Sequence, residues 1–187
     1  MQLWPTAELT GFSERSGGVD FEFASSFGYN LKSLRTFLYP FANGDPGTAS
    51  YEIRGLYWED YAYLGLIPLV AGLVGGLWLA FQKRHERTRR LVRLLLALAV
   101  AAFLISLGKN TPVFRLAYTW IPGMSYFRFP QRLLSVVTLC LAVTAALSLT
   151  QFQSWLVKTR AWKTVGARHP RLANHAKTLI GVVLLLL

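Results

Sequence analysis

The sequence predicts an all-α, polytopic membrane protein. Of its 187 residues, 53% are hydrophobic, yet its formal net charge is +11. These two properties coexist most readily in a membrane protein, where apolar spans alternate with basic loops. The apolar residues also come in long blocks, whereas the helices and strands of a water-soluble protein alternate apolar and polar faces.

Three apolar blocks approach the roughly 20 residues that a helix needs to cross a bilayer. We expect complete transmembrane helices at residues 61–81, 91–107 and 133–152. The first and third blocks carry no charge. Arg93 lies two residues inside the second block, and we expect its long side chain to reach back to the membrane interface.

Small residues in these blocks suggest where the helices pack. Gly72 and Gly76 form a small-xxx-small pair that lets a neighbouring helix approach closely. Cys140 lies in the middle of the third block and is expected to be a small buried apolar residue. With one cysteine, the chain has neither an internal disulfide nor a multi-cysteine metal site.

Both ends of the chain have the character of a truncation. Residues 178–187 are apolar but amount to half a span, so we expect a truncated fourth helix there. The first 15 residues lack the basic start and apolar centre of a signal peptide. We therefore expect that a preceding span is also missing.

The loop charges predict the orientation. Residues 82–93 carry a net charge of +5 and residues 153–177 carry +6, whereas residues 1–60 carry −4. Short basic loops remain in the cytoplasm, so loops 82–90 and 153–177 are expected inside. Residues 1–60 and 108–132 are then outside, although the second of these segments carries +4.

The outer segments are rich in aromatic residues. Residues 1–63 hold 14 of the 26 aromatic side chains, and residues 113–129 hold six more. Such rings either form an interfacial belt or line a cleft that binds sugar or lipid, and the sequence leaves both interpretations open. Asn30 caps an expected short helix over residues 30–38, which places Leu31, Leu34, Phe37 and Leu38 on one face against the membrane surface.

A second amphipathic helix is expected in the 108–132 loop. Pro112 suits its first turn, and Pro122-Gly123 ends it. Its expected apolar stripe consists of Val113, Phe114, Leu116, Ala117, Trp120 and Ile121. Arg115, Tyr118 and Thr119 are expected to face the other way.

Two arginines follow this helix at the outer boundary of the third span. Arg128 and Arg132 lie in the run Phe127 to Arg132, between aromatic rings and the stiff Pro130. Guanidinium groups bind phosphate through two parallel hydrogen bonds, and phosphate lies at this depth of the bilayer. The pair either binds the phosphate of a lipid-linked donor or anchors ordinary headgroups.

Acidic residues offer a second candidate site. Glu59 and Asp60 precede the first span, and together they could hold a divalent metal ion or deprotonate an acceptor hydroxyl. The alternative is that they balance charge and pair with arginines. Glu14 and Arg15 either line the outer cleft or form an exposed ion pair.

Residues of the outer loop resemble a known family. The stretch from Gly108 to Arg132 is similar to a motif of bacterial YfhO-type membrane proteins, and the resemblance covers most of residues 3–150. In this chain, its residues are Gly108-Lys109-Asn110-Thr111-Pro112-Val113-Phe114, Tyr118, Ile121-Pro122-Gly123 and Phe127-Arg128-Phe129-Pro130-Gln131-Arg132. Earlier similarities include Leu3-Trp4-Pro5-Thr6, Tyr39-Pro40 and Tyr63-Leu64-Gly65.

That family resembles the GT-C glycosyltransferases, which move a sugar from a polyprenyl-phosphate carrier to an acceptor outside the cell. The resemblance implies an envelope glycopolymer acceptor and a place in the bacterial cytoplasmic (inner) membrane. It also implies that Arg128 and Arg132 neutralise the carrier phosphate, with help from Lys109 and Arg115. No residue matches the carboxylate that is usually catalytic in GT-C enzymes, so this chain would hold scaffold and donor site without the base.

A non-catalytic function fits the same residues. The outer arginines could serve only as headgroup anchors in a non-catalytic transporter or envelope-assembly scaffold. A buried polar group in mid-span would favour transport, whereas the uncharged first and third blocks speak against an ion path. Nucleic acid is not an expected partner, because the basic loops flank membrane spans, where anionic lipid explains them.

Overall fold

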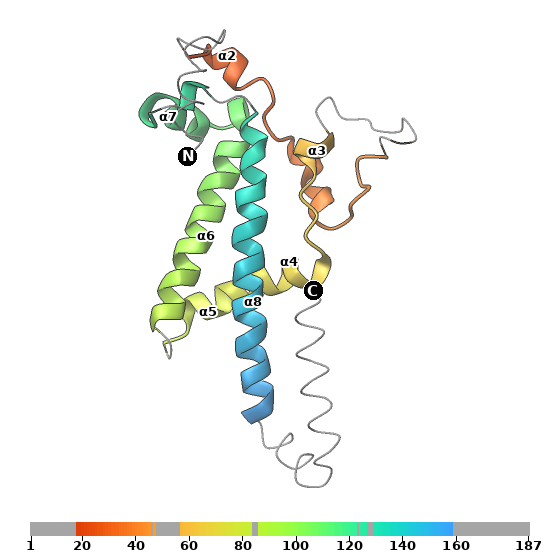
Figure 1. Cartoon of the computed structure of the whole chain (residues 1–187), viewed down its shortest axis with the longest axis vertical. Coiled ribbons are helices and arrows are strands. Elements are labelled where there is room, and N and C mark those ends of the chain that lie inside the picture. The colour runs from red at the N-terminus through yellow and green to blue at the C-terminus, as the bar shows by residue number, and fades with distance from the viewer. Residues whose placement is uncertain are drawn as a thin grey trace, which may run out of the picture. The chain divides into compact units, whose positions relative to one another are not determined.

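The computed structural model describes residues 18–45, 47, 57–83, 86–122, 124–126 and 129–158. All regular structure in these ranges is helical, which confirms the predicted all-α class there (Figure 1). The chain divides into two compact units. The first combines residues 1–63 with 100–137, and the second combines residues 64–99 with 138–187.

Two long helices, α6 (Glu86–Ser106) and α8 (Leu134–Lys158), contribute residues to both units. The other helices described in the first unit are short. They are α2 (Phe21–Ala24), η1 (Leu31–Phe37), α3 (Tyr57–Asp60), η4 (Gly108–Asn110), α7 (Pro112–Trp120), η5 (Met124–Tyr126) and η6 (Pro130–Leu133).

Asparagine caps the helix that was expected over residues 30–38. The side chain of Asn30 accepts a hydrogen bond from the backbone N–H of Lys32 at 2.9 Å. The helix is a 3₁₀ helix, which is tighter than the α-helix and brings residues three apart onto one side. Ser33 and Thr36 are buried, while Leu31 is 55% exposed and Leu34 is 43% exposed. The predicted outward-facing stripe is therefore confirmed for Leu31, Leu34 and Leu38, but it is wrong for Phe37, which is 8% exposed.

The segment before η1 packs closely against the end of α6. The backbone N–H of Tyr29 donates to the carbonyl of Ser106 at 2.8 Å. A Cβ on Gly28 would lie 2.5 Å from the carbonyl oxygen of Leu107, so the backbones can approach this closely only at a glycine. Gly108 has a φ of +56°, a left-handed conformation that glycine adopts at little cost just after a helix ends.

The expected helix after Pro112 forms as α7, but its predicted apolar stripe is wrong in part. Phe114 and Ala117 are buried as expected. Tyr118 lies on the same side rather than facing away, because its hydroxyl donates to the carbonyl of Val19 and its ring meets Phe21 edge-on at 5.5 Å. The remaining large members of the stripe point outward, namely Leu116, Trp120 and Ile121.

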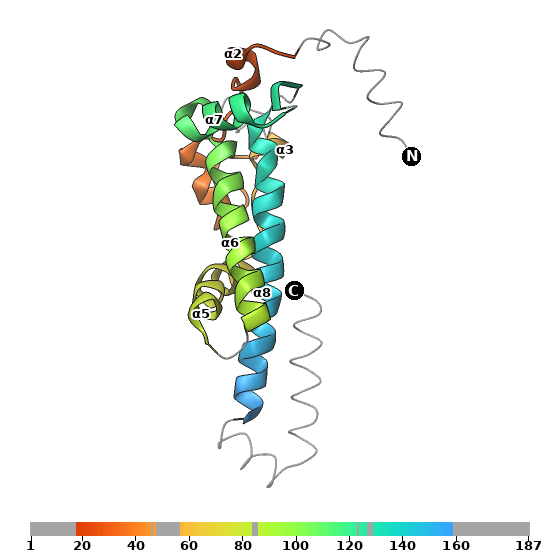
Figure 2. The ribbon, with the colours of Figure 1, turned by 90° about the vertical axis from the view of Figure 1, so that its left-hand side faces the viewer.

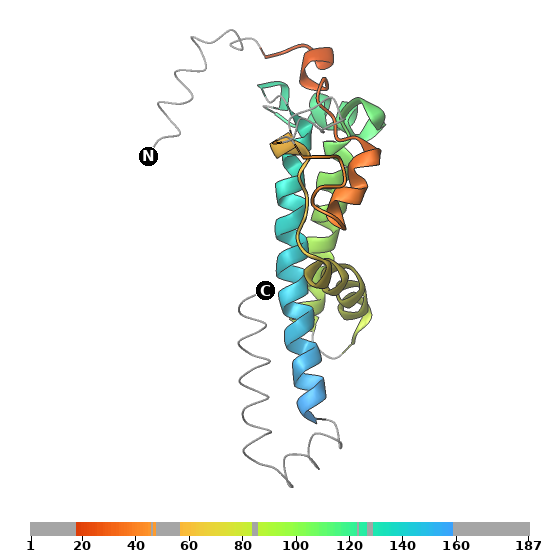
Figure 3. The same cartoon turned by 90° about the vertical axis from the view of Figure 1, so that its right-hand side faces the viewer.

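The second unit is built on the crossing of two helical segments. The first is a continuous run of α4 (Leu66–Val70), the π-helical segment η3 (Ala71–Gly75) and α5 (Gly76–Phe81). This run crosses α8, while α6 and α8 lie side by side in opposite directions (Figures 1, 2 and 3). A small apolar core of Leu79, Ala80 and Val92 joins α5 to α6.

The predicted small-residue packing of the second unit is confirmed. A Cβ on Gly72 would lie 2.7 Å from the carbonyl oxygen of Leu141, and one on Gly76 would lie 2.5 Å from Cγ2 of Thr144. Both glycines therefore let the crossing run touch α8 directly. Cys140 is buried on α8, as expected.

Only one helical stretch in the described ranges, Pro130–Leu156, is long and apolar enough to cross a membrane. It contains the predicted third span, residues 133–152, and extends into residues 153–156, which belong to the predicted cytoplasmic loop. The first predicted span shortens to Leu66–Phe81, because residues 61–65 are not helical. At 1.5 Å per residue this helix rises roughly 24 Å, less than the roughly 30 Å hydrocarbon core.

The second predicted span lies in α6, which begins at Glu86 and carries Arg89, Arg90 and Arg93. Three complete spans are therefore not confirmed. The Nε of Arg93 donates to the carbonyl of Ala80 at 2.8 Å, so that the guanidinium caps the C-terminal end of α5. That its side chain reaches the membrane interface stays a prediction.

Candidate functional site

An ion pair between Arg132 and Glu59 forms the centre of the candidate site in the first unit. Arg132 lies on η6 and Glu59 on α3, two elements that are 73 residues apart in sequence and in contact in space. The Nε–H group of Arg132 reaches both carboxylate oxygens of Glu59, at 2.8 and 3.0 Å. The structure thus confirms, for Glu59, the alternative that this acid pairs with an arginine.

A strained turn holds the Arg132 side chain in place. Phe129 has a φ of +67°, which is unusual for a residue with a large side chain. Pro130 follows and starts η6, where its fixed φ suits the first helical position. This turn brings the Phe129 ring under the guanidinium, with Cζ of Arg132 4.8 Å from the ring centroid. The expectation that aromatic rings flank this arginine is met at Phe129.

The arrangement leaves part of the guanidinium available. Glu59 is only 17% exposed, whereas 63% of the Arg132 side chain remains exposed. Glu59 takes the Nε–H, and a guanidinium carries four further N–H donors on its two terminal nitrogens. Those donors are spaced to match two oxygens of a phosphate. Arg132 can therefore keep its partner acid and bind an anion at the same time.

The other predicted phosphate ligands contribute differently. Lys109 is exposed on η4, and Arg115 is exposed on α7 with its Cζ 5.6 Å from the ring centroid of Phe21. Among the described residues, no hydrogen bond or ion pair connects either of them to Arg132. Arg128, Glu14 and Arg15 lie outside the described residues.

The expected acid pair of Glu59 and Asp60 is divided between two environments. Asp60 is 3% exposed, and its backbone carbonyl accepts a hydrogen bond from the hydroxyl of Thr36 at 3.4 Å. Glu59 is instead committed to Arg132. Within the ranges that the structure describes, no three His, Cys, Asp or Glu residues gather as metal ligands would.

Asp60 borders a buried polar cluster that sequence reasoning missed. Tyr29 is fully buried, and its hydroxyl donates to the carbonyl of Ser33 at 2.7 Å and lies 3.4 Å from the hydroxyl of Thr36. Asn43 donates to the hydroxyl of Ser33 at 3.0 Å and accepts from Arg35 at 2.9 Å. The cluster ties η1 to the loop that follows it, while the leucines of η1 face outward.

Burial raises the pKa of Tyr29 from 10.0 to about 12, and the nearby charge of Asp60 adds to the rise, while the Thr36 hydroxyl opposes it. Since folding raises this pKa, the folded state holds the proton more tightly. The free energy of unfolding should fall by roughly 2–3 kcal/mol as the pH rises from about 10 to about 12. The same unfolding experiment in detergent on Tyr29→Phe should show a shallower decline, and an equal decline would contradict this assignment.

Gln131 is a second residue that the sequence did not single out. It follows Pro130 on η6 and is 1% exposed, and its side-chain Nε2 has no hydrogen-bond partner among the residues that the structure describes. A glutamine is ordinarily exposed, so residue type alone does not predict this burial. No signal in the sequence separates it from the neighbouring polar residues.

Comparison with family models finds no match for this chain, and comparisons with curated proteins and with solved structures find none either.

Proposed function

We propose that this chain is part of an integral membrane glycosyltransferase of the GT-C type, resembling the YfhO family. Its donor would be a polyprenyl-phosphate sugar and its acceptor an envelope glycopolymer. In this proposal the first unit lies on the outer face of the bacterial cytoplasmic membrane. Arg132 there binds the phosphate of the donor, and the exposed Lys109 and Arg115 add positive charge around it.

The distribution of side chains supports a place in the membrane. In the second unit, Leu94 is 69% exposed, Val74 is 64% exposed and Leu139 is 63% exposed, while Thr144 and Ser148 are buried. A soluble protein of this kind would leave a large unpartnered apolar surface in water. Hydrocarbon as the solvent removes that cost, and small polar residues then serve the contacts between helices. The three-span topology, with residues 1–60 and 108–132 outside, is part of the proposal.

The exposed, ring-supported guanidinium of Arg132 is the observation that carries the proposed function. It stands at the start of Pro130–Leu156, the apolar stretch long enough to span a membrane. A phosphate group at the bilayer boundary lies within reach of such a residue. Glu59 fixes the direction of the side chain from the Nε side, which reduces the freedom that Arg132 loses when an anion binds.

The test compares two substitutions that break the same ion pair. Arg132→Gln should lower glycosyl transfer from a polyprenyl-phosphate sugar by about 10²-fold, since one stabilising donor group is lost. Glu59→Gln should retain most of the transfer, because the guanidinium remains. Transfer would be measured in membranes from cells that express the full-length protein, with insertion checked by immunoblotting. Equal losses in both variants would assign the pair a structural role only.

That second outcome would favour a non-catalytic scaffold. The observation that favours a scaffold is the ion pair itself, because Glu59 already supplies Arg132 with a counter-charge. In a scaffold, Arg132→Gln and Glu59→Gln would reduce the amount of inserted protein in parallel, and transfer in the membranes would fall only in proportion to that amount.

A further inference from the structure

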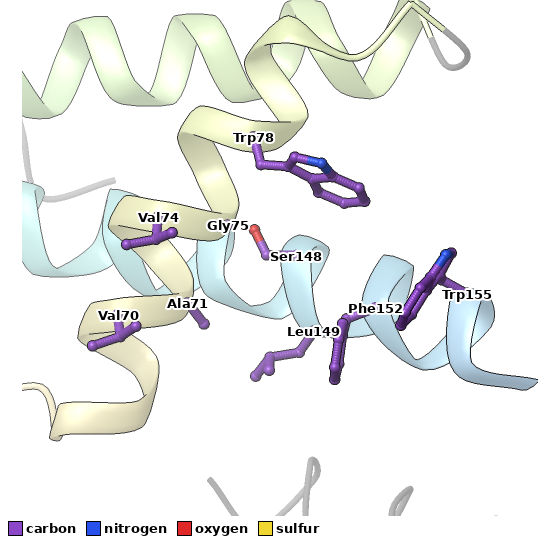
Figure 4. Close-up of a pocket in the computed structure, with 9 residues that line it drawn as sticks. All are labelled: Val70, Ala71, Val74, Gly75, Trp78, Ser148, Leu149, Phe152 and Trp155. Atoms are coloured by element: carbon purple, nitrogen blue, oxygen red, sulfur yellow. The ribbon is translucent and has the colours of Figure 1, made fainter.

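An apolar groove of about 530 Å³ lies in the second unit, between the α4–η3–α5 run and the C-terminal half of α8 (Figure 4). Val70 and Val74 form one wall, and Leu149 lies on the other. Gly75 and Ser148 meet where the two helices approach. The hydroxyl of Ser148 donates to the carbonyl of Thr144 in its own helix at 2.8 Å, so its proton is already engaged.

Aromatic side chains border one part of the groove. Figure 4 shows Trp78 extending from α5, and Phe152 and Trp155 following one another along α8. The rings of Phe152 and Trp155 stack, with centroids 5.9 Å apart and planes 24° apart. Indoles favour the depth of lipid headgroups, because their N–H group can meet polar partners while the ring remains in hydrocarbon.

Positive charge follows the aromatic residues. Lys83 is exposed and lies just after the end of α5, the helix that carries Trp78. Arg87 is exposed in the first turn of α6. Glu86, the acid of that turn, contacts Arg89 and Arg90. In Figure 1, α6 begins at the end of the second unit toward which α8 runs, so the first turn of α6 and the C-terminal half of α8 lie toward the same end of that unit.

We propose that this groove binds one acyl chain of an anionic phospholipid, whose headgroup lies beside Trp78, Lys83 and Arg87. The walls match a hydrocarbon chain, since they are almost entirely apolar: the Ser148 hydroxyl is engaged within α8, and the indole N–H groups belong to the aromatic border where the headgroup would lie. The volume is in the range of about 300–1,000 Å³ that small-molecule sites occupy. The cations beside the indoles select a negative headgroup, as basic pockets between membrane helices do.

This proposal depends on the membrane location of the second unit and not on glycosyl transfer. Arg132 belongs to the first unit, so loss of lipid binding leaves the Arg132 and Glu59 comparison intact. Conversely, a structural role for the Arg132 pair leaves this groove unaffected.

The experiment uses the full chain in lipid nanodiscs, in a variant that keeps Trp78 and Trp155 as its tryptophans. Phosphatidylcholine discs would receive increasing fractions of phosphatidylglycerol with brominated acyl chains, and tryptophan quenching would be recorded. Quenching should saturate at a low fraction of brominated phosphatidylglycerol. Brominated phosphatidylcholine, by contrast, should quench only in proportion to its amount, as bulk lipid does.

Matched variants locate the binding. Ala71→Phe fills the groove and should raise the half-saturating fraction about tenfold, whereas Leu73→Phe, on the same turn but outside the groove, should leave it unchanged. Phe152→Ala removes a wall residue without adding bulk and should weaken binding, and Leu139→Ala on the same helix should not. Lys83→Gln with Arg87→Gln should abolish the preference for phosphatidylglycerol.

Equal, unsaturated quenching by both lipids would overturn the proposal, because the groove would then hold ordinary bulk lipid. No quenching by either lipid would overturn it as well. In that case, formation of a disulfide in the double variant Val74→Cys with Ile180→Cys would show that residues 178–187 of the chain itself occupy the groove.

Discussion

Gly76→Ala should destabilise the second unit by about 1–3 kcal/mol, and Thr144→Ser in the same chain should restore most of that loss. The added methyl would lie 2.5 Å from Cγ2 of Thr144, which is too close for two carbon atoms. Its next neighbours are the two methyl groups of Leu96 at 3.6 and 3.8 Å, an ordinary contact. Serine lacks Cγ2 but keeps the hydroxyl that donates to the carbonyl of Cys140.

The measurement is a double-mutant cycle of unfolding in detergent micelles. Thr150→Ser is the matched control, since Thr150 makes the same kind of hydroxyl bond on an exposed face of α8. It should not rescue Gly76→Ala. Rescue by both serines, or full stability of Gly76→Ala alone, would show that the run containing Gly76 does not cross α8 at this position.

Gly28→Ala should destabilise the first unit even more, by about 3 kcal/mol or above, and no side-chain change should rescue it. The added Cβ would lie 2.5 Å from the Leu107 carbonyl oxygen and 3.1 Å from Cα of Gly108. Both obstacles are backbone atoms, so only separation of the two segments relieves them. Separation breaks the hydrogen bond from the Tyr29 N–H to Ser106.

Hydrogen exchange at the Tyr29 amide tests this directly. Exchange should accelerate strongly in Gly28→Ala. In Ser26→Ala, two residues earlier, it should remain slow, because the exposed Ser26 hydroxyl bonds only to Phe23 in its own turn. Slow exchange in Gly28→Ala would contradict the close approach of Gly28 to Leu107.

Local features of the fold could be predicted from the sequence because a few neighbouring residues determine them. Asn30 caps its helix since its side chain reaches the N–H group two residues later. Pro112 begins a helix because its fixed φ suits the first turn. Gly72 and Gly76 lie on one helical face, so their contact with a neighbouring helix followed from their spacing alone.

Features that depend on distant residues could not be predicted. The apolar periodicity of α7 predicted that Leu116 and Trp120 lie on the same side as Phe114. Phe21 instead contacts Phe114 and Tyr118, and the Tyr118 hydroxyl donates to the carbonyl of Val19. The partner of Arg93 is the carbonyl of Ala80, and such a backbone acceptor leaves no trace in residue types. The length of the first apolar block also did not predict the length of the helix, because residues 61–65 of that block are not helical.

In the candidate site, too, features that neighbouring residues determine could be predicted, whereas features that depend on distant residues could not. The sequence placed Arg132 beside aromatic rings and a proline, and the structure has this arrangement. It also placed Glu59 among acids that either bind metal or pair with arginine. The choice between those alternatives required the contact of α3 with η6, which spans 73 residues. Phe129 in the left-handed region is a further property that only the backbone shows.

The sidedness of the two ends of α6 tests the proposed membrane topology. Asn110→Cys and Arg87→Cys, each in a Cys140→Ser background, place one thiol after this helix and one in its first turn. In intact cells, a membrane-impermeant maleimide should label the cysteine at position 110 and should label the one at 87 only after the membrane is opened. Labelling of both positions in intact cells, or release of the protein into buffer without detergent, would contradict the membrane topology and the outer phosphate site with it.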